Sequence, residues 1–302
     1  MKSNLTPNDS GFSEQQNSLT ESNKKQYMKT ILFPTDFSET SEKALNVVRY
    51  IAQKSNACIH VFHVYNIPVT LYNNMDAIIP PQIIDDVRIS AEKEAAALKK
   101  NLEADGFIVE VTVEMGSVTD EIISITHKNS FDLLIMGTTG DGNLVNKIIG
   151  SNASAVLMRV NIPVLLVPKD CVFDGFKSIV YLDELKDDDI EVLDALFSLS
   201  KEIGVRNLSL LNINTGFFFE PVDEKLMTRL TTAFGADQLV IDSVTAADVK
   251  QGIDLYLEQT QIDLVVMSTK KKTILERLFV KSNTKIMAMQ SKIPLLVYHR
   301  NV

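Results

Sequence analysis

The sequence predicts an α/β protein of two tandem domains, each built on a doubly wound parallel sheet of five strands. Three observations lead to this fold class. Short apolar runs alternate with longer amphipathic segments from residue 29 onward. The alternation restarts near residue 178, and the later parts of the two halves align without a gap at an offset of 131 residues. Apolar strands joined by helical crossovers are typical of parallel sheets that are buried on both faces.

Length and composition agree with this organisation. A chain of 302 residues fits two domains, because single α/β cores seldom grow beyond about 150–200 residues. The net charge of −9 argues against broad contact with nucleic acid or with an anionic membrane, since both need a basic face. Two cysteines give no disulfide framework. No apolar run approaches the ~18 residues of a membrane span, so we expect a cytoplasmic protein.

The order of the elements divides the chain into three parts. Residues 1–27 are polar and predict a disordered tail, because they cannot bury enough surface to offset their ordering entropy. We expect the domains to cover 28–170 and 177–302, with the boundary in the segment 169–176. The periodicity predicts strands at 31–33, 58–64, 107–113, 133–136 and 164–167, helices at 40–54, 82–104, 119–129 and from 151, then a strand at 178–182 and a helix at 190–203.

The duplication rests on three ungapped matches at the same offset. They pair Asp132–Met136 with Asp263–Met267, Ser151-Asn152 with Ser282-Asn283, and Ile162–Leu166 with Ile293–Val297.

A glycine-rich segment follows the strand at 133–136 and leads into a helix. Gly137 would let the chain turn sharply at the strand end, and Gly140 would keep the loop open to close approach. Gly150 and Ser151 would present unpaired N–H groups at a helix N-terminus, where the peptide dipoles favour an anion such as phosphate. The alternative is that these glycines only permit a tight connection between strand and helix. The segment is not a P-loop, because no G-x-x-x-x-G-K-[ST] spacing occurs in the chain.

A second candidate lies directly after the first strand. In open parallel sheets, ligands bind beyond the carboxyl ends of the strands that flank the topological switch point. Asp36 follows such an end, and its carboxylate can accept a hydrogen bond from an exocyclic amine or a ribose hydroxyl. The alternative is an N-cap for the following helix, a role that Ser38 could fill equally well.

Together these residues resemble the universal stress protein family. Residues 34–39 look like the opening of that family, and Gly137-x2-Gly140-x9-Gly150-Ser151 matches its ATP-binding pattern. The resemblance covers 28–168 strongly and 177–299 more weakly. It implies a Rossmann-like sheet with its switch point between the first and fourth strands, and ATP as the ligand, with or without Mg²⁺. It also implies that Asp36 and the backbone of Val64 hold the adenosine, that Gly137, Gly140, Gly150 and Ser151 hold the phosphates, and that Thr35, Met136 and Asn152 line the site.

The second domain departs from this pattern, so we expect no ATP there. Side chains would fill the space that a nucleotide needs. Lys270–Lys272 could hold an anion by charge alone, but a solvated loop is the preferred interpretation. At equivalent positions, Gly137 becomes Ser268, Gly140 becomes Lys271, Gly150 becomes Lys281 and Asp36 becomes Glu184.

Other candidate sites are weak. His60 and His63 lie three apart on a predicted strand, so they point to opposite faces and cannot share a metal. Cys58 and His60 share a face without an apparent third ligand, whereas a zinc site needs three or four. We therefore assign no metal site and no catalytic residue.

Two classes of function remain open. One is an ATP-binding stress-response or regulatory protein, and the other is a slow ATPase or an adenylate-transferring enzyme on the same fold. Lys147 and Lys281 are the basic residues near the motifs, and neither has the spacing of a catalytic phosphate lysine, which favours the binder. A third alternative is an interaction scaffold whose site is empty, and the intact glycines argue against it.

The last strand of each domain suggests how the two domains associate. In the family that the sequence resembles, single domains pair through this strand. Val164–Val167 and Leu295–Val297 are apolar and would otherwise be open edges. We expect them to pack together as an intramolecular pseudo-dimer, in which the second domain is a structural and regulatory partner. The alternative is two independent domains on the segment 169–176, and a homodimer of the whole chain also remains open.

Overall fold

The protein is described from a computed structural model, which covers residues 28–67, 80–138, 150–182, 190–215, 228, 231–232, 239–269 and 292–299. The predicted disordered tail at 1–27 lies outside them. The first repeat contains β1 (Thr30–Pro34), α2 (Glu39–Ser55), β2 (Cys58–Tyr65), α3 (Pro81–Ala104), β3 (Val109–Met115), α4 (Val118–Lys128), β4 (Leu133–Gly137), α5 (Ser151–Arg159) and β5 (Val164–Val167). The second contains β6 (Ser178–Leu182), α6 (Ile190–Ile203), β7 (Asn207–Asn214), β8 (Leu239–Thr245), α8 (Val249–Gln259), β9 (Leu264–Thr269) and β10 (Leu295–His299).

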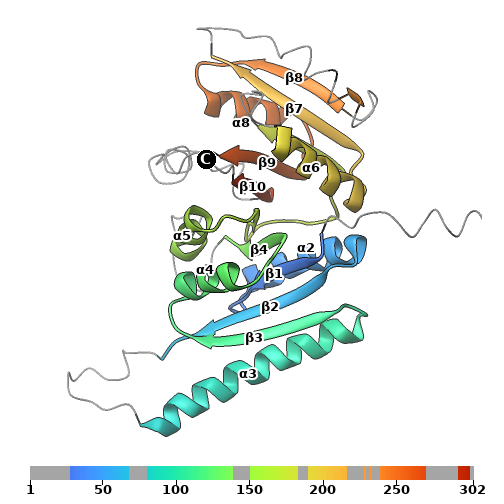
Figure 1. The fold of residues 1–302 in the computed structure, drawn as a ribbon. Helices are drawn as coiled ribbons and strands as arrows, with labels where there is room; N and C mark the ends of the chain where they lie inside the picture. Colours follow the sequence, from blue (N-terminus) through green and yellow to red (C-terminus); the bar gives the residue numbers. More distant parts are fainter. Residues whose placement is uncertain are drawn as a thin grey trace, which may run out of the picture.

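The described strands form one continuous sheet in the order β3-β2-β1-β4-β5-β10-β9-β6-β7-β8. Within each repeat the pairing is parallel, as predicted. In Figure 1 the first repeat, blue to green, lies below the second, and β10 lies at the junction between them. The chain moves outward from β1 to β2 and β3 and then returns to β4 on the other side of β1. The topological switch point therefore lies between β1 and β4, as predicted.

Helices cover both faces of the sheet. Buried residues of α2, α3 and α6 form one core with the strands, whereas α4 and α5 build a second core on the opposite face. In α2 the apolar residues Ala44, Leu45, Val48 and Ile51 are buried against the sheet. This helix begins behind Ser38, whose side chain accepts from the N–H of Ser41, and it ends at Asn56 in the left-handed conformation, with φ of 54°. No helix within the described residues is long and apolar enough to cross a lipid bilayer.

The duplication is visible as a repeated hydrogen-bonding pattern. Asp132 Oδ2 accepts from the backbone N–H groups of Lys29 and Thr30, at 2.7 and 2.9 Å. Asp263 accepts from the two N–H groups at the start of β6, at 2.9 Å each. In both repeats an aspartate just before the fourth strand thus fixes the start of the first strand, because a carboxylate that accepts two N–H groups ties the two chain segments together.

The two halves of the sheet join through β5 and β10, which pair antiparallel. Leu165 lies opposite Leu296 and Val164 lies opposite Val297, and all four side chains are fully buried. The predicted contact between the two edge strands is therefore present, and the two five-stranded sheets are halves of one sheet.

The segment between the domains is packed rather than extended. Phe176 and Cys171 are buried, and Phe176 makes an edge contact with the ring of Tyr50 on α2. The hydroxyl of Tyr50 donates to the carbonyl of Ile203 at the end of α6, at 3.1 Å. These contacts and the shared core are not the arrangement of two independent domains on a linker.

Residues 28–170 expressed alone should self-associate or aggregate, because β5 would then present an unpaired apolar edge. Size-exclusion chromatography with light scattering, run beside the full chain, measures this. A monomeric fragment that unfolds at the same urea concentration as the full chain would instead support independent domains.

Candidate functional site

The candidate site lies at the carboxyl ends of β1 and β4, which are neighbours in the sheet. Asp36 follows β1 by two residues, and Thr138 directly follows β4. The N–H of Thr138 donates to the carbonyl of Val167 at 2.9 Å, and its own carbonyl accepts from the N–H of Gly150 at 2.5 Å. The two described ends of the glycine-rich segment are thereby held together, and α5 begins at the carboxyl end of β4.

Asp36 belongs to a compact hydrogen-bonding network at the start of α2. Its Oδ1 accepts from the N–H of Ser38 at 3.1 Å and from the hydroxyl of Ser41 at 2.6 Å. Burial raises the pKa of this carboxyl, but the hydrogen bonds from Ser38 and Ser41 outweigh it, so the pKa is lowered and the group is ionised at neutral pH. Both of these hydrogen bonds end on Oδ1 and the residue is exposed, so Oδ2 can accept from a ligand.

The sequence left open whether Asp36 or Ser38 caps α2, and the structure assigns the cap to Ser38. Asp36 instead fixes the capping residues from outside the helix, which leaves its carboxylate at the edge of the sheet.

Phe37 adopts an unusual backbone conformation between these two residues. Its φ is 58°, in the left-handed region, which is strained for a bulky side chain. Its ring packs on the imidazole of His63, with the centroids 4.6 Å apart, and Nδ1 of His63 donates to the carbonyl of Thr35 at 2.8 Å. The N–H of Phe37 donates to the hydroxyl of Thr35 at 3.0 Å. These contacts hold the turn that places Asp36.

The backbone N–H and C=O of Val64 point to the side of β2 where β1 lies, but β1 ends before it reaches them. Phe62 accepts from the N–H of Thr35 at 2.9 Å, whereas Tyr65 accepts from Gly116 on the other side. Because backbone groups alternate along a strand, the N–H and C=O of Val64 point to the same side as those of Phe62. The pairing of β2 with β1 stops at Phe62, so these groups of Val64 lie beyond the last paired residue of β1.

The sequence predicts that Gly137 allows a sharp turn at the strand end, and the structure gives a packing reason for this glycine. Its φ is not among the positive values, so no sharp left-handed turn is needed there. A Cβ on Gly137 would instead come within 2.7 Å of Cγ2 of Thr40, at the start of α2, and within 3.2 Å of the carbonyl oxygen of Thr40. Gly137 therefore lets β4 and α2 approach closely.

The prediction that the N–H of Gly150 is unpaired is wrong, because this N–H donates to the carbonyl of Thr138. Gly150 is the N-cap residue of α5, and its carbonyl accepts from the N–H of Ser154 at 3.0 Å, the first bond of the helix. The N–H groups that α5 itself leaves unsatisfied are those of Ser151, Asn152 and Ala153, one position further along.

The other predicted site residues differ in their exposure to solvent. Met136 is buried in the core under α4 and α5, and Thr35 is buried beside the turn. Asn152 is exposed, and its Oδ1 accepts from the hydroxyl of Thr119 on α4 at 3.4 Å. Gly140 lies outside the described residues.

The equivalent edge of the second repeat is different. Ser268, at the position of Gly137, is buried and its hydroxyl accepts from the hydroxyl of Tyr181 at 3.0 Å. A side chain thus occupies the position where the first repeat has none. Glu184, Lys270–Lys272 and Lys281 lie outside the described residues.

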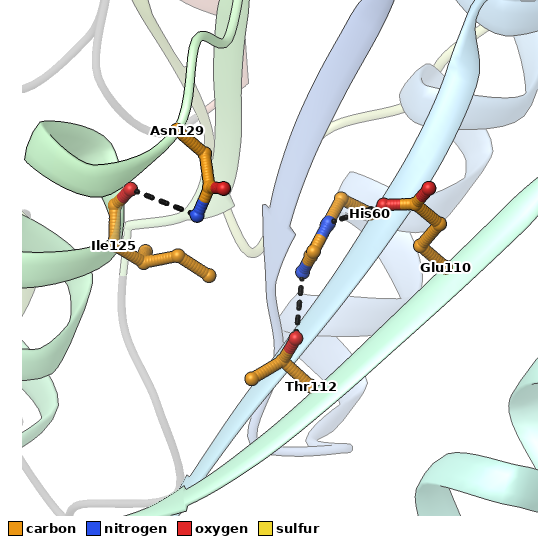
Figure 2. Close-up of polar contacts among 5 residues, drawn as sticks. All are labelled: His60, Glu110, Thr112, Ile125 and Asn129. Carbon is orange, nitrogen blue, oxygen red and sulfur yellow. Dashed lines mark hydrogen bonds and ion pairs between the residues drawn. The ribbon is translucent and has the colours of Figure 1, made fainter.

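His60 is held by β3 rather than by a metal cluster. Figure 2 shows its Nδ1 directed to Glu110, at 3.2 Å, and its Nε2 directed to the hydroxyl of Thr112, at 2.9 Å. Burial lowers the pKa of His60, and the carboxylate of Glu110 opposes this shift. In the part of the chain that the structure describes, no group of three or more His, Cys, Asp or Glu side chains is arranged to hold a metal ion.

Sequence reasoning missed the structural roles of Phe37, His63, Thr40 and Thr138. A bulky residue between Asp36 and Ser38 carries no pattern that indicates a left-handed conformation, and the contact between Gly137 and Thr40 joins residues distant in sequence. Thr138 could have been found, since it follows a buried strand whose next backbone groups need partners.

The fold and this edge define a class: a tandem α/β protein whose repeats are each doubly wound and share one sheet. The model of the universal stress protein family matches residues 28–168 and 216–299. The chain therefore belongs to the universal stress protein family.

Individual relatives agree with the tandem organisation. The chain is similar to universal stress protein MJ0577 of Methanocaldococcus jannaschii, with 29% identity over 154 residues that cover 47% of this chain and 95% of the relative. Universal stress protein G of Escherichia coli O157:H7 is 28% identical over 141 residues, which are 46% of this chain and 98% of the relative. The crystal structure of a universal stress protein from Archaeoglobus fulgidus covers 91% of this chain and 97% of its own, with a TM-score of 0.70 and 20% identity, and shows the same fold.

Gly137→Ala should destabilise the protein by about 1–3 kcal/mol, the usual cost of overpacking, because the new methyl group would meet Thr40. The double variant Gly137→Ala with Thr40→Ser should recover part of this loss, since it removes the methyl group that the alanine meets. Urea unfolding measures both. An alanine variant as stable as the wild type would show that the glycine is not needed for packing.

Proposed function

We propose that the first domain binds one ATP per chain at the edge formed by β1, β4 and the start of α5, and that the chain acts as an ATP-binding stress-response or regulatory protein. The observation that carries this proposal is a juxtaposition. An ionised carboxylate and an open helix N-terminus lie at the carboxyl ends of neighbouring strands, at the topological switch point, where doubly wound sheets bind ligands.

The start of α5 supplies the phosphate contacts. Ser151 and Asn152 are exposed, so their N–H groups can donate to phosphate oxygens. The aligned peptide dipoles of the helix add to this attraction. The family's ATP-binding pattern of glycines spans this same segment. Any Mg²⁺ would be bound by the phosphates.

The ends of β1 and β2 supply the adenosine contacts. Oδ2 of Asp36 can accept from a ribose hydroxyl or an exocyclic amine. The N–H and C=O of Val64 offer one donor and one acceptor beyond the end of β1, a combination that matches the edge of an adenine base.

The second domain acts as a structural partner. Ser268, which accepts from the hydroxyl of Tyr181, stands at the position of Gly137, and Lys271 and Lys281 stand at the positions of Gly140 and Gly150. We therefore assign the nucleotide to the first domain alone, with β5 and β10 joining the two.

The test is calorimetry with ATP, with and without Mg²⁺, on a pair of matched proline variants. Ser151→Pro removes the N–H donor, together with the side-chain hydroxyl, at the first position of α5, where proline is well tolerated in a helix and where the extended Gly150 can precede it. Val249→Pro makes the same change at the exposed first position of α8.

We expect one ATP per chain, a roughly tenfold weaker affinity for Ser151→Pro, in line with the loss of a hydrogen bond to a charged group, and no change for Val249→Pro. Both variants should unfold at the wild-type urea concentration. Two equal sites per chain, or an unchanged affinity for Ser151→Pro, would contradict the proposal.

Asp36→Ala tests the adenosine contacts separately. It should weaken ATP by about 1–3 kcal/mol while it leaves inorganic triphosphate almost unchanged, because triphosphate lacks the groups that Asp36 would bind. ATP should also outcompete GTP for the wild type. Competition binding measures these differences, and equal losses for ATP and triphosphate would remove Asp36 from the adenosine site.

A further inference from the structure

The last strand of the second domain reaches the proposed phosphate-binding helix of the first. His299 ends β10, and its Nε2 lies 2.7 Å from the carbonyl oxygen of Leu157 in α5. Its Nδ1 lies 3.1 Å from the carbonyl oxygen of Ile162, in the connection to β5. The imidazole therefore bridges the carboxyl-terminal part of α5 and the segment that follows it.

The chemistry of these contacts makes His299 the donor. Both partners are backbone carbonyls, which only accept hydrogen bonds. Burial lowers the pKa of His299, against the opposing effect of the two carbonyls, so the ring is neutral at pH 7 and donates through one nitrogen at a time. Nε2 makes the shorter contact.

The contact gives a hydrogen-bond donor to a carbonyl group at the end of α5, which would otherwise have no partner within the helix. Leu157 belongs to the last turn of α5, where carbonyl groups have no partner within the helix. The described residues of α5, β5, β9 and β10 carry one charged side chain, Arg159, which is paired with Asp120 of α4 at 2.9 Å. Arg159 is thus directed to α4, whereas His299 connects α5 to the second domain.

The contact is also asymmetric between the repeats. At the offset of 131, the position of His299 corresponds to Pro168 in the first repeat. A proline has neither a side-chain donor nor an N–H, so the first domain cannot make the same contact in return. The donor therefore belongs to the second domain and the acceptors belong to the first, which is the domain that keeps the glycines.

We propose that His299 is a positioning residue through which the second domain holds α5, so that the N–H groups at the opposite end of this helix are fixed for phosphate. This inference rests on the proposed function for its effect on ATP, but the holding of α5 can be observed without nucleotide.

The experiment uses the full chain with His299→Phe, which removes the donors, and His299→Gln, which keeps an N–H donor. His127→Phe is the matched control, because His127 is exposed on α4. Hydrogen exchange of the α5 amides is measured without nucleotide. Affinities for ATP, inorganic triphosphate and adenosine are measured by calorimetry or by competition.

His299→Phe should speed exchange across α5 and leave α4 unchanged. It should weaken ATP and inorganic triphosphate by roughly threefold to tenfold, the effect of one lost buried hydrogen bond on an equilibrium constant, without changing adenosine. His299→Gln should restore both readouts at least in part, and His127→Phe should match the wild type.

The outcomes separate the two proposals. If no protein binds ATP but His299→Phe still speeds exchange in α5, the proposed function fails and the holding of α5 stands without its effect on the nucleotide. Unchanged exchange in α5, or equal losses for adenosine and triphosphate, would overturn the role of His299.

Discussion

The antiparallel pairing of β5 with β10 is the contact on which the rest of the structure depends. It places β5 and β10, two apolar strands, at the centre of one sheet, and it thereby closes the edge that each repeat would otherwise leave open at this strand. It also fixes the orientation of the two repeats relative to each other, because β5 and β10 run in opposite directions along their shared hydrogen bonds. With that orientation set, α2 packs beside α6 in one shared core, and the end of β10 meets α5. The relation between the second domain and the proposed nucleotide site follows from this pairing.

At the end of β1, the contacts that begin α2 are also the contacts that hold the candidate site. The network that begins α2 includes Ser38, Ser41 and Asp36, and the same network keeps the carboxylate of Asp36 ionised. The left-handed conformation of Phe37 is strained and destabilises this turn, and the contact of its ring with His63 compensates for part of the strain. The two interpretations of Asp36, as a helix-start residue and as a ligand contact, are therefore compatible, because Ser38 takes the cap and Asp36 keeps one oxygen at the edge.

Much of the fold could be predicted from the sequence, whereas only part of the site could. The strands and helices of the first repeat follow from apolar periodicity, which depends on burial alone, whereas the pairing of the repeats was implied by the resemblance to the family. The role of Gly137 could not be predicted, because it depends on Thr40, which lies nearly a hundred residues earlier in the chain. The hydrogen bond from Gly150 to Thr138 was likewise hidden, since it closes a long segment whose ends meet only in the folded chain. His299 gave no signal because its partners are backbone carbonyls, which any sequence supplies.

The differences between the repeats fall at the carboxyl ends of the strands, whereas the similarities fall in the contacts that hold the sheet together. Asp132 and Asp263 tie the start of the first strand in the same way, and the carbonyls of Pro163 and Pro294 accept from the fourth strand at 2.9 and 3.0 Å. These contacts serve the sheet, which both repeats need because each supplies half of it. At the carboxyl ends of the strands, Ser268 stands opposite Gly137 and His299 opposite Pro168 in the alignment of the repeats. The sheet thus places the same requirements on both repeats, whereas at its carboxyl edge the second repeat supplies a donor, His299, to a helix of the first.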